Sequence, residues 1–76
     1  MRVIRMEASG QGDVNVKYVT EAKLTEAPNH GLNDWFNSLE EEDCVASFYA
    51  DSAGERAFLR DNPVEIIEDI EGLYIY

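Results

Sequence analysis

Residues 32–39 have the sequence LNDWFNSL, which carries the clearest secondary-structure signal in the chain. Its apolar residues recur at the spacing that lines one face of an α-helix: Leu32, Trp35, Phe36 and Leu39. We therefore expect a helix over this stretch, with that face turned toward a core. We expect Asn29 or Asn33 to cap its start, because either amide oxygen can accept a free first-turn N–H.

Two strand-like stretches precede this helix. Residues 2–8 and 14–18 flank the turn-forming sequence SGQGD at 9–13, which predicts a β-hairpin. The second stretch alternates so that three apolar side chains share one face: Val14, Val16 and Tyr18. This strand has room to continue toward Leu24 before the interruption at residues 27–29.

A second strand pair is predicted after the helix. Residues 44–50 alternate as a strand, the sequence DSAG at 51–54 is typical of a turn, and residues 55–60 are expected to return as the hairpin partner. A helix over residues 51–60 is the competing interpretation.

The sequence NPVE at residues 62–65 has the pattern of a helix start. Asn62 would be the cap, Pro63 the first helical residue and Glu65 the third. The inward face of this helix would then hold Ile66, Ile67 and Ile70. Gly72 would end the helix. The β-prone residues 73–76 are expected to complete a sheet.

These elements predict one α+β domain over residues 1–76, with the order ββαββαβ. We expect a small, mainly antiparallel sheet with two short helices on one face. The 76 residues contain no repeat and no linker, and a chain of this length hides only about 60% of the surface that its unfolded form exposes. A deep catalytic cleft is therefore hard to build.

The chain is strongly acidic, with sixteen Asp and Glu against six Lys and Arg and a net charge of −10. Acidic and basic groups cancel in residues 1–30, so the excess belongs to residues 31–76. Such a field repels nucleic acid and anionic membranes and accelerates encounter with a basic protein surface. We expect neither direct nucleic-acid binding nor membrane binding.

Few residues are suited to catalysis. The single histidine, His30, lies in a predicted loop, and the single cysteine, Cys44, lies in a predicted core strand where an inert thiol is the usual outcome. No phosphate-binding loop, zinc pattern or EF-hand spacing is present, so we expect neither an enzyme nor a bound cofactor. A calcium site formed by residues 40–43 is disfavoured, because consecutive positions at a helix end point in different directions.

The acids themselves form the candidate binding surface. The sequence EEED at residues 40–43 follows the apolar stripe of the first helix, where carboxylates oppose the helix dipole and no nearby Lys or Arg compensates. Residues that give up local stability in this way tend to mark functional surfaces. An acidic stripe on the second predicted helix and acids in the neighbouring turns complete the set of partner-binding residues: Glu40, Glu41, Glu42, Asp43, Asp51, Glu55, Glu65, Glu68 and Asp69.

In its length, its charge and its lack of cysteine pairs and catalytic motifs, the chain resembles small phage-encoded inhibitors, particularly anti-CRISPR proteins and DNA mimics. The resemblance covers the whole chain and implies a stoichiometric inhibitor that docks on a basic nucleic-acid-binding surface of a bacterial defence complex. Two alternatives remain: an antitoxin-like or immunity-like protein that neutralises a basic toxin enzyme, and a structural or adaptor domain whose acidity serves solubility. The unpaired cysteine and the absence of an apolar leader predict a cytoplasmic protein, in the bacterial host if phage-encoded.

Overall fold

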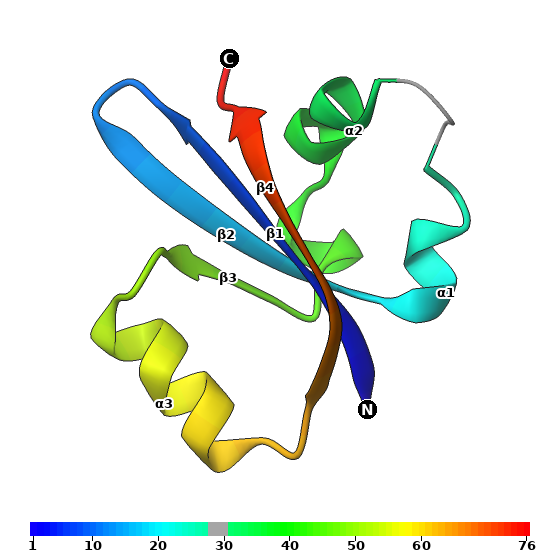
Figure 1. Ribbon diagram of the computed structural model, residues 1–76, viewed down its shortest axis with the longest axis vertical. Helices are drawn as coiled ribbons and strands as arrows, with labels where there is room; N and C mark the ends of the chain where they lie inside the picture. Colours follow the sequence, from blue (N-terminus) through cyan, green and yellow to red (C-terminus); the bar gives the residue numbers. More distant parts are fainter. Residues whose placement is uncertain (28–30) are drawn as a thin grey trace.

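The computed structural model of the protein describes residues 1–27 and 31–76. Four strands form one mixed sheet in the order β3-β2-β1-β4, and short helices pack against it (Figure 1). The predicted α+β class is therefore confirmed. The elements are β1 (Arg2–Gly10), β2 (Asp13–Thr20), α1 (Glu21–Leu24), α2 (Leu32–Ser38), the 3₁₀ helix η1 (Glu41–Asp43), β3 (Ala46–Tyr49), α3 (Ala53–Asp61) and β4 (Glu65–Tyr74).

The N-terminal hairpin forms as predicted. Strands β1 and β2 pair antiparallel up to Gly10 and Asp13, and the two residues between them have positive φ, 54° at Gln11 and 84° at Gly12. Two such residues form the kind of turn whose twist matches that of the flanking strands. Strand β2 ends at Thr20 rather than continuing toward Leu24, because the Thr20 side chain accepts a hydrogen bond from the Lys23 N–H and so starts α1.

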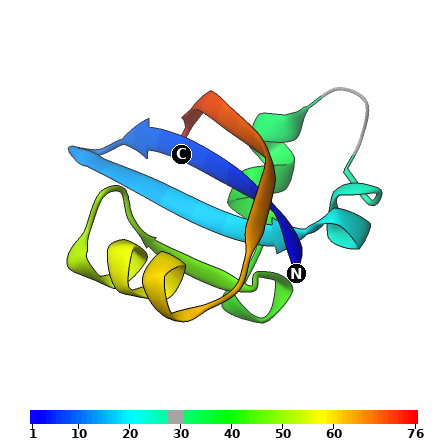
Figure 2. The ribbon, with the colours of Figure 1, turned by 60° about the horizontal axis from the view of Figure 1, so that its bottom comes forward.

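The sheet separates two apolar clusters, and α2 and α3 cover opposite faces of it (Figure 2). One cluster contains Ile4, Met6, Ala8 and Val19 with Phe36 and Leu39 from the α2 side. The other contains Val3, Val16 and Tyr18, against which Phe58 of α3 packs. The prediction that both helices cover one face is therefore wrong. Strand β1 is buried on both of its sides, since Val3 and Arg5 on one side and Ile4 and Met6 on the other are all buried, and so a helix covers each face.

Residues 65–74 form strand β4 and not the predicted helix. Ile67, Ile70 and Leu73 all pack against the α2-side cluster, and their spacing of three imitates a helix face. The spacing arises because β4 pairs parallel with β1 through two register shifts, opposite Val3/Ile4 and Met6/Ala8. Each shift adds a residue to the normal strand period of two. Asn62 ends α3 instead of starting a helix.

The competing interpretation of residues 51–60 is the correct one. Ser52 accepts a hydrogen bond from the Glu55 N–H at 3.1 Å and caps α3, so residues 55–60 do not return as a strand. Helix α2 is confirmed, but its N-cap is Gly31, with φ of 85°. Asn33 lies within α2 and accepts a hydrogen bond from the Tyr74 N–H instead. The alternative cap, Asn29, lies outside the described residues.

Both ends of the chain are attached to the sheet. The Met1 ammonium donates to the Pro63 carbonyl oxygen, and the Glu65 N–H donates to the Met1 carbonyl oxygen. At the other end, the Ile75 N–H donates to the Ser9 carbonyl oxygen. Among the described residues, no helix combines the length and apolar character needed to cross a membrane.

Gly10 permits the close approach of the C-terminal segment. A Cβ at this position would lie 2.7 Å from the Ile75 carbonyl oxygen, so we expect Gly10→Ala to lower the free energy of unfolding by about 1–3 kcal/mol. Denaturant unfolding measures the change. Ser9→Ala, at an exposed neighbouring position, is the control and should change stability by less than about 0.5 kcal/mol. Equal stability of the two variants would contradict this close approach.

Candidate functional site

A buried guanidinium joins three elements of the fold. Arg5, 9% exposed on β1, contacts Glu55 of α3 at 2.9 Å and Asp69 of β4 at 3.1 Å. The third carboxylate that Arg5 contacts is that of Glu7, two residues further along the same strand, at 3.0 Å. Because a planar guanidinium offers several N–H donors in fixed directions, one Arg can hold three carboxylates at once.

Glu55 is the most enclosed member of this network, with 3% of its surface exposed. One carboxylate oxygen accepts from Arg5 and from the Tyr18 hydroxyl, and the other accepts from the Asp51 N–H at 2.8 Å. Burial alone would raise the pKa of Glu55, but the hydrogen bonds from Arg5, Tyr18 and Asp51 outweigh it and lower the pKa. Burial and the contact with Glu55 raise the pKa of the Tyr18 hydroxyl.

Two of the predicted partner-binding acids therefore have internal roles. We expected Glu55 in a surface turn, but its side chain is buried against Arg5. Asp69 is exposed in part and is also paired with Arg5. The network borders a shallow polar depression of about 520 Å³, which Asp51 and Glu71 also line.

The acids at residues 40–43 do not continue α2. That helix ends at Ser38, and the acids form η1, a separate turn with the carboxylates at its beginning, where helix dipoles favour them. A cation also reaches the end of α2, contrary to our expectation. The Lys17 ammonium of β2 donates to the carbonyl oxygens of Phe36 and Leu39 at 2.7 and 2.8 Å. Burial lowers the pKa of Lys17.

Seven of the nine predicted partner-binding acids fall into two groups at different edges of the sheet, and Asp51 and Glu55 lie at the start of α3. Residues 40–43 lead into β3, while Glu65, Glu68 and Asp69 lie on β4, and the strand order places β3 and β4 at opposite ends of the sheet. Within the first group, Asp43 contacts Lys23 at 3.3 Å. The Glu40 N–H donates to the Asp43 carboxylate, and this bond and Lys23 lower the pKa of Asp43.

Most basic side chains contact a carboxylate or a carbonyl oxygen of the same chain. Arg2, Lys23 and Arg60 each pair with a nearby carboxylate, and Arg56 donates to the Asp51 carbonyl oxygen. The remaining acidic side chains are all exposed and have no ion-pair partner among the described residues: Asp13, Asp34, Glu40, Glu41, Glu42, Asp51, Glu65, Glu68 and Glu71.

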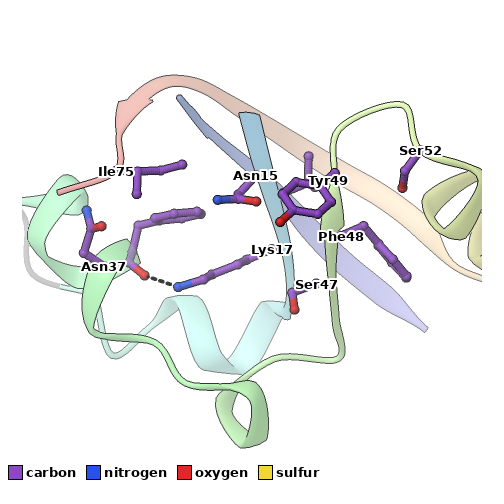
Figure 3. A pocket seen from close by; sticks show the side chains of 10 residues that line it. Asn15, Lys17, Asn37, Ser47, Phe48, Tyr49, Ser52 and Ile75 are labelled. Atoms are coloured by element: carbon purple, nitrogen blue, oxygen red, sulfur yellow. Dashed lines mark hydrogen bonds between the residues drawn. The ribbon is translucent and has the colours of Figure 1, made fainter. Parts of the chain in front are cut away.

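A groove of about 440 Å³ lies over β2 and β3, and we call it the β2–β3 groove (Figure 3). Asn15, Lys17, Ser47 and Tyr49 come from the two strands, while α2 and Ile75 form the opposite wall. The Lys17 ammonium also lies 4.4 Å from the centre of the Phe36 ring. A second surface depression of about 490 Å³, the acidic hollow, shares Ser47 and Phe48 with this groove and is otherwise lined by Glu41, Glu42, Val45 and Ala46.

The other residues weighed for chemistry lie apart from these features. Cys44 is half-buried against the α2-side cluster, and burial raises the pKa of its thiol, which disfavours the reactive thiolate. His30 lies outside the described residues. In residues 1–27 and 31–76, no group of His, Cys, Asp and Glu side chains has the arrangement of a metal site, including the acids at 40–43.

Neither a protein-family model, nor a curated protein, nor a solved structure matches the chain. The sequence reading named Glu55 and Asp69 as surface acids but missed Arg5 and its pairing with them, although two signals were present. The sequence SAGE at 52–55 has the Ser-x-x-Glu pattern of a helix N-terminus, and Arg5 interrupts the apolar run of residues 3–6. A cation in such a run requires a buried anion opposite it.

Glu55→Gln tests the Arg5 network. Removing one partner of a buried ion pair leaves the other charge uncompensated, so we expect a loss of about 3 kcal/mol in unfolding free energy at neutral pH. Folding lowers the pKa of Glu55. The stability that its ionised carboxylate contributes is therefore fully present above the unfolded-state pKa of about 4.3 and is lost as the pH falls through the folded-state pKa.

The difference in unfolding free energy between the native chain and Glu55→Gln should therefore be constant between about pH 5 and 8 and shrink in more acidic solution. Denaturant titrations at several pH values measure it. Glu42→Gln, at an exposed position, is the matched control and should change stability by less than about 0.5 kcal/mol. A difference that persists unchanged into acid would show that the Glu55 charge does not stabilise the fold.

Proposed function

We propose that the protein is an acidic binding protein that docks on a basic, nucleic-acid-binding surface of a target complex, in the manner of a DNA mimic or an anti-CRISPR inhibitor. The observation that supports this most is the asymmetry of its ion pairs. The bases are engaged by internal acids or by carbonyl oxygens, whereas many exposed acids have no ion-pair partner within the described residues.

A partner rich in Lys and Arg supplies the missing positive charge. Opposite fields steer two proteins together and make association fast and dependent on salt. The target's groove is adapted to the closely spaced phosphates of a nucleic acid. Exposed carboxylates on a small scaffold compete for that groove, so the protein acts by occupying it.

The acids leading into β3 are the best-placed contact within this surface. Glu40, Glu41 and Glu42 are consecutive and exposed, and none of them is in an ion pair with a described residue. On β4, by contrast, Asp69 is already held by Arg5, and Glu55 is buried beside it. The proposed contact is therefore centred on residues 40–42, and Glu65 and Glu68, on the opposite edge strand β4, lie outside it.

Capture from a bacterial lysate tests the proposal. The immobilised protein should retain a nucleic-acid-binding protein at low salt and release it at high salt, and added duplex DNA should displace it because both ligands occupy one groove. Mass spectrometry identifies what elutes. Retention that DNA does not reduce, or a captured partner that binds no nucleic acid, contradicts the proposal.

A triple variant with Glu40→Gln, Glu41→Gln and Glu42→Gln identifies the contact surface. Exposed ion pairs are each worth about 0.5 kcal/mol, so loss of three should weaken binding of the captured protein about tenfold. The control removes the same charge elsewhere, through Asp13→Asn, Glu21→Gln and Glu26→Gln, and should retain most of the affinity. Calorimetry with the purified partner measures both, and equal weakening would indicate that only net charge matters.

A further inference from the structure

Strand β3 leaves one side of its backbone open. It lies at the end of the sheet and pairs only with β2. The Ala50 N–H donates to the Val14 carbonyl oxygen, and groups that point toward the partner alternate along an antiparallel strand. The backbone groups of Phe48 therefore point toward β2, and those of Ser47 and the Tyr49 N–H point outward. The Tyr49 carbonyl oxygen accepts from the Ser52 N–H in the next turn, so the open donors and acceptors are those of Ser47 and the Tyr49 N–H. An extended chain of another protein can pair with such an edge.

The opposite edge of the sheet is less suited to strand addition. Strand β4 has two register shifts, which break the regular spacing of hydrogen-bonding groups along it. Its exposed side chains include Glu65, Glu68 and Glu71, and charged side chains on an edge discourage strand pairing. Strand β3 has exposed Ser47 and Tyr49 in place of such charges, and the Tyr49 side chain is 62% exposed.

Surface depressions beside β3 offer places for alternate side chains of an added strand. The β2–β3 groove contains Phe36 and Ile75, together with the Lys17 ammonium, which the carbonyl oxygens of Phe36 and Leu39 already hold. The Phe48 ring points to the other face of the sheet, where it packs against Tyr18 and Phe58. This groove therefore fits an uncharged apolar side chain. The acidic hollow, which shares Ser47 and Phe48 with the groove, brings Glu41 and Glu42 to the same strand and fits Lys or Arg.

We propose that β3 is a docking edge, to which an extended segment of a basic partner protein adds as a further strand. An apolar side chain of that segment enters the β2–β3 groove, and a neighbouring Lys or Arg contacts Glu41 and Glu42. The inference rests on the proposed function and defines how the partner is held. A second copy of this chain is the less suitable occupant, since each copy has a net charge of −10 and brings the same two glutamates.

A peptide probe tests this edge directly. The probe is a short acetylated and amidated peptide in which valine alternates with lysine, titrated into the isotope-labelled native protein. We expect NMR signals of Ser47, Tyr49, Glu41 and Glu42 to shift in a saturable way. Methylating alternate backbone nitrogens of the peptide should weaken binding at least about tenfold, because it removes edge hydrogen bonds without changing charge. Oligolysine, which lacks the apolar side chains, should bind similarly weakly.

Ser47→Pro supplies a matched test on the protein. Proline is tolerated where a strand's N–H faces away from the sheet, and it removes that donor and obstructs an added strand. We expect about a tenfold loss of peptide affinity, while Ser47→Thr, which keeps the N–H, binds like the native chain. Unfolding midpoints confirm that both variants fold. If Ser47→Pro does not fold, the methylated peptide and oligolysine still decide the question with the native chain.

Three results would overturn the proposal. The methylated peptide could bind as well as the unmethylated one, or the NMR shifts could concentrate on β4. The protein could also form dimers by itself through β3. Each result would contradict the addition of a partner strand to β3. Dimerisation is measured by sedimentation, with Ser47→Pro as the comparison.

If the partner captured from lysate binds Ser47→Pro as well as the native chain, the docking mode is wrong and the proposed function remains. If DNA fails to displace that partner, the proposed function is wrong, whatever the peptide does.

Discussion

The Arg5 guanidinium is the contact on which the arrangement of the molecule depends. Strand β1 provides it from the middle of the sheet, α3 provides Glu55, and β4 provides Asp69, so segments far apart in the sequence meet at one cation. A buried charge is tolerated only when it is paired, and here Tyr18 and the Asp51 N–H complete the shell around Glu55. The network thereby fixes α3 over the sheet face opposite α2.

This use of positive charge explains why the surface is so acidic. Six Lys and Arg are available, and each contacts a carboxylate or a carbonyl oxygen of the same chain. Little positive charge is left to balance the exposed carboxylates, whose field extends into solvent. The Lys and Arg side chains are therefore engaged within the chain, while the exposed carboxylates are left to attract the positive charges of a partner. This contrast is the physical basis of the proposed binding function.

Local signals predicted the local elements of this fold. The turn residues Gln11 and Gly12 and the apolar stripe at 32–39 specify their hairpin and helix without distant contacts. Strand β4 was mistaken for a helix because its bulges, which depend on pairing with β1, give its apolar residues a period of three. The acids at 40–43 were recognised, but their separation from the β4 acids follows from strand order, which composition and periodicity do not encode. Pairing of Glu55 with Arg5, fifty positions apart, was equally beyond a local reading.

The parallel pairing of β1 with β4 has a consequence for how the chain folds. The first hairpin closes through a two-residue turn, so it can form early, whereas the other edge of β1 must wait for the last strand. During synthesis, therefore, one edge of the central strand β1 stays unpaired until residues 65–74 have left the ribosome. Arrival of that segment supplies the β4 side of the sheet and a counter-charge for Arg5 together, which favours a single late, cooperative step in folding.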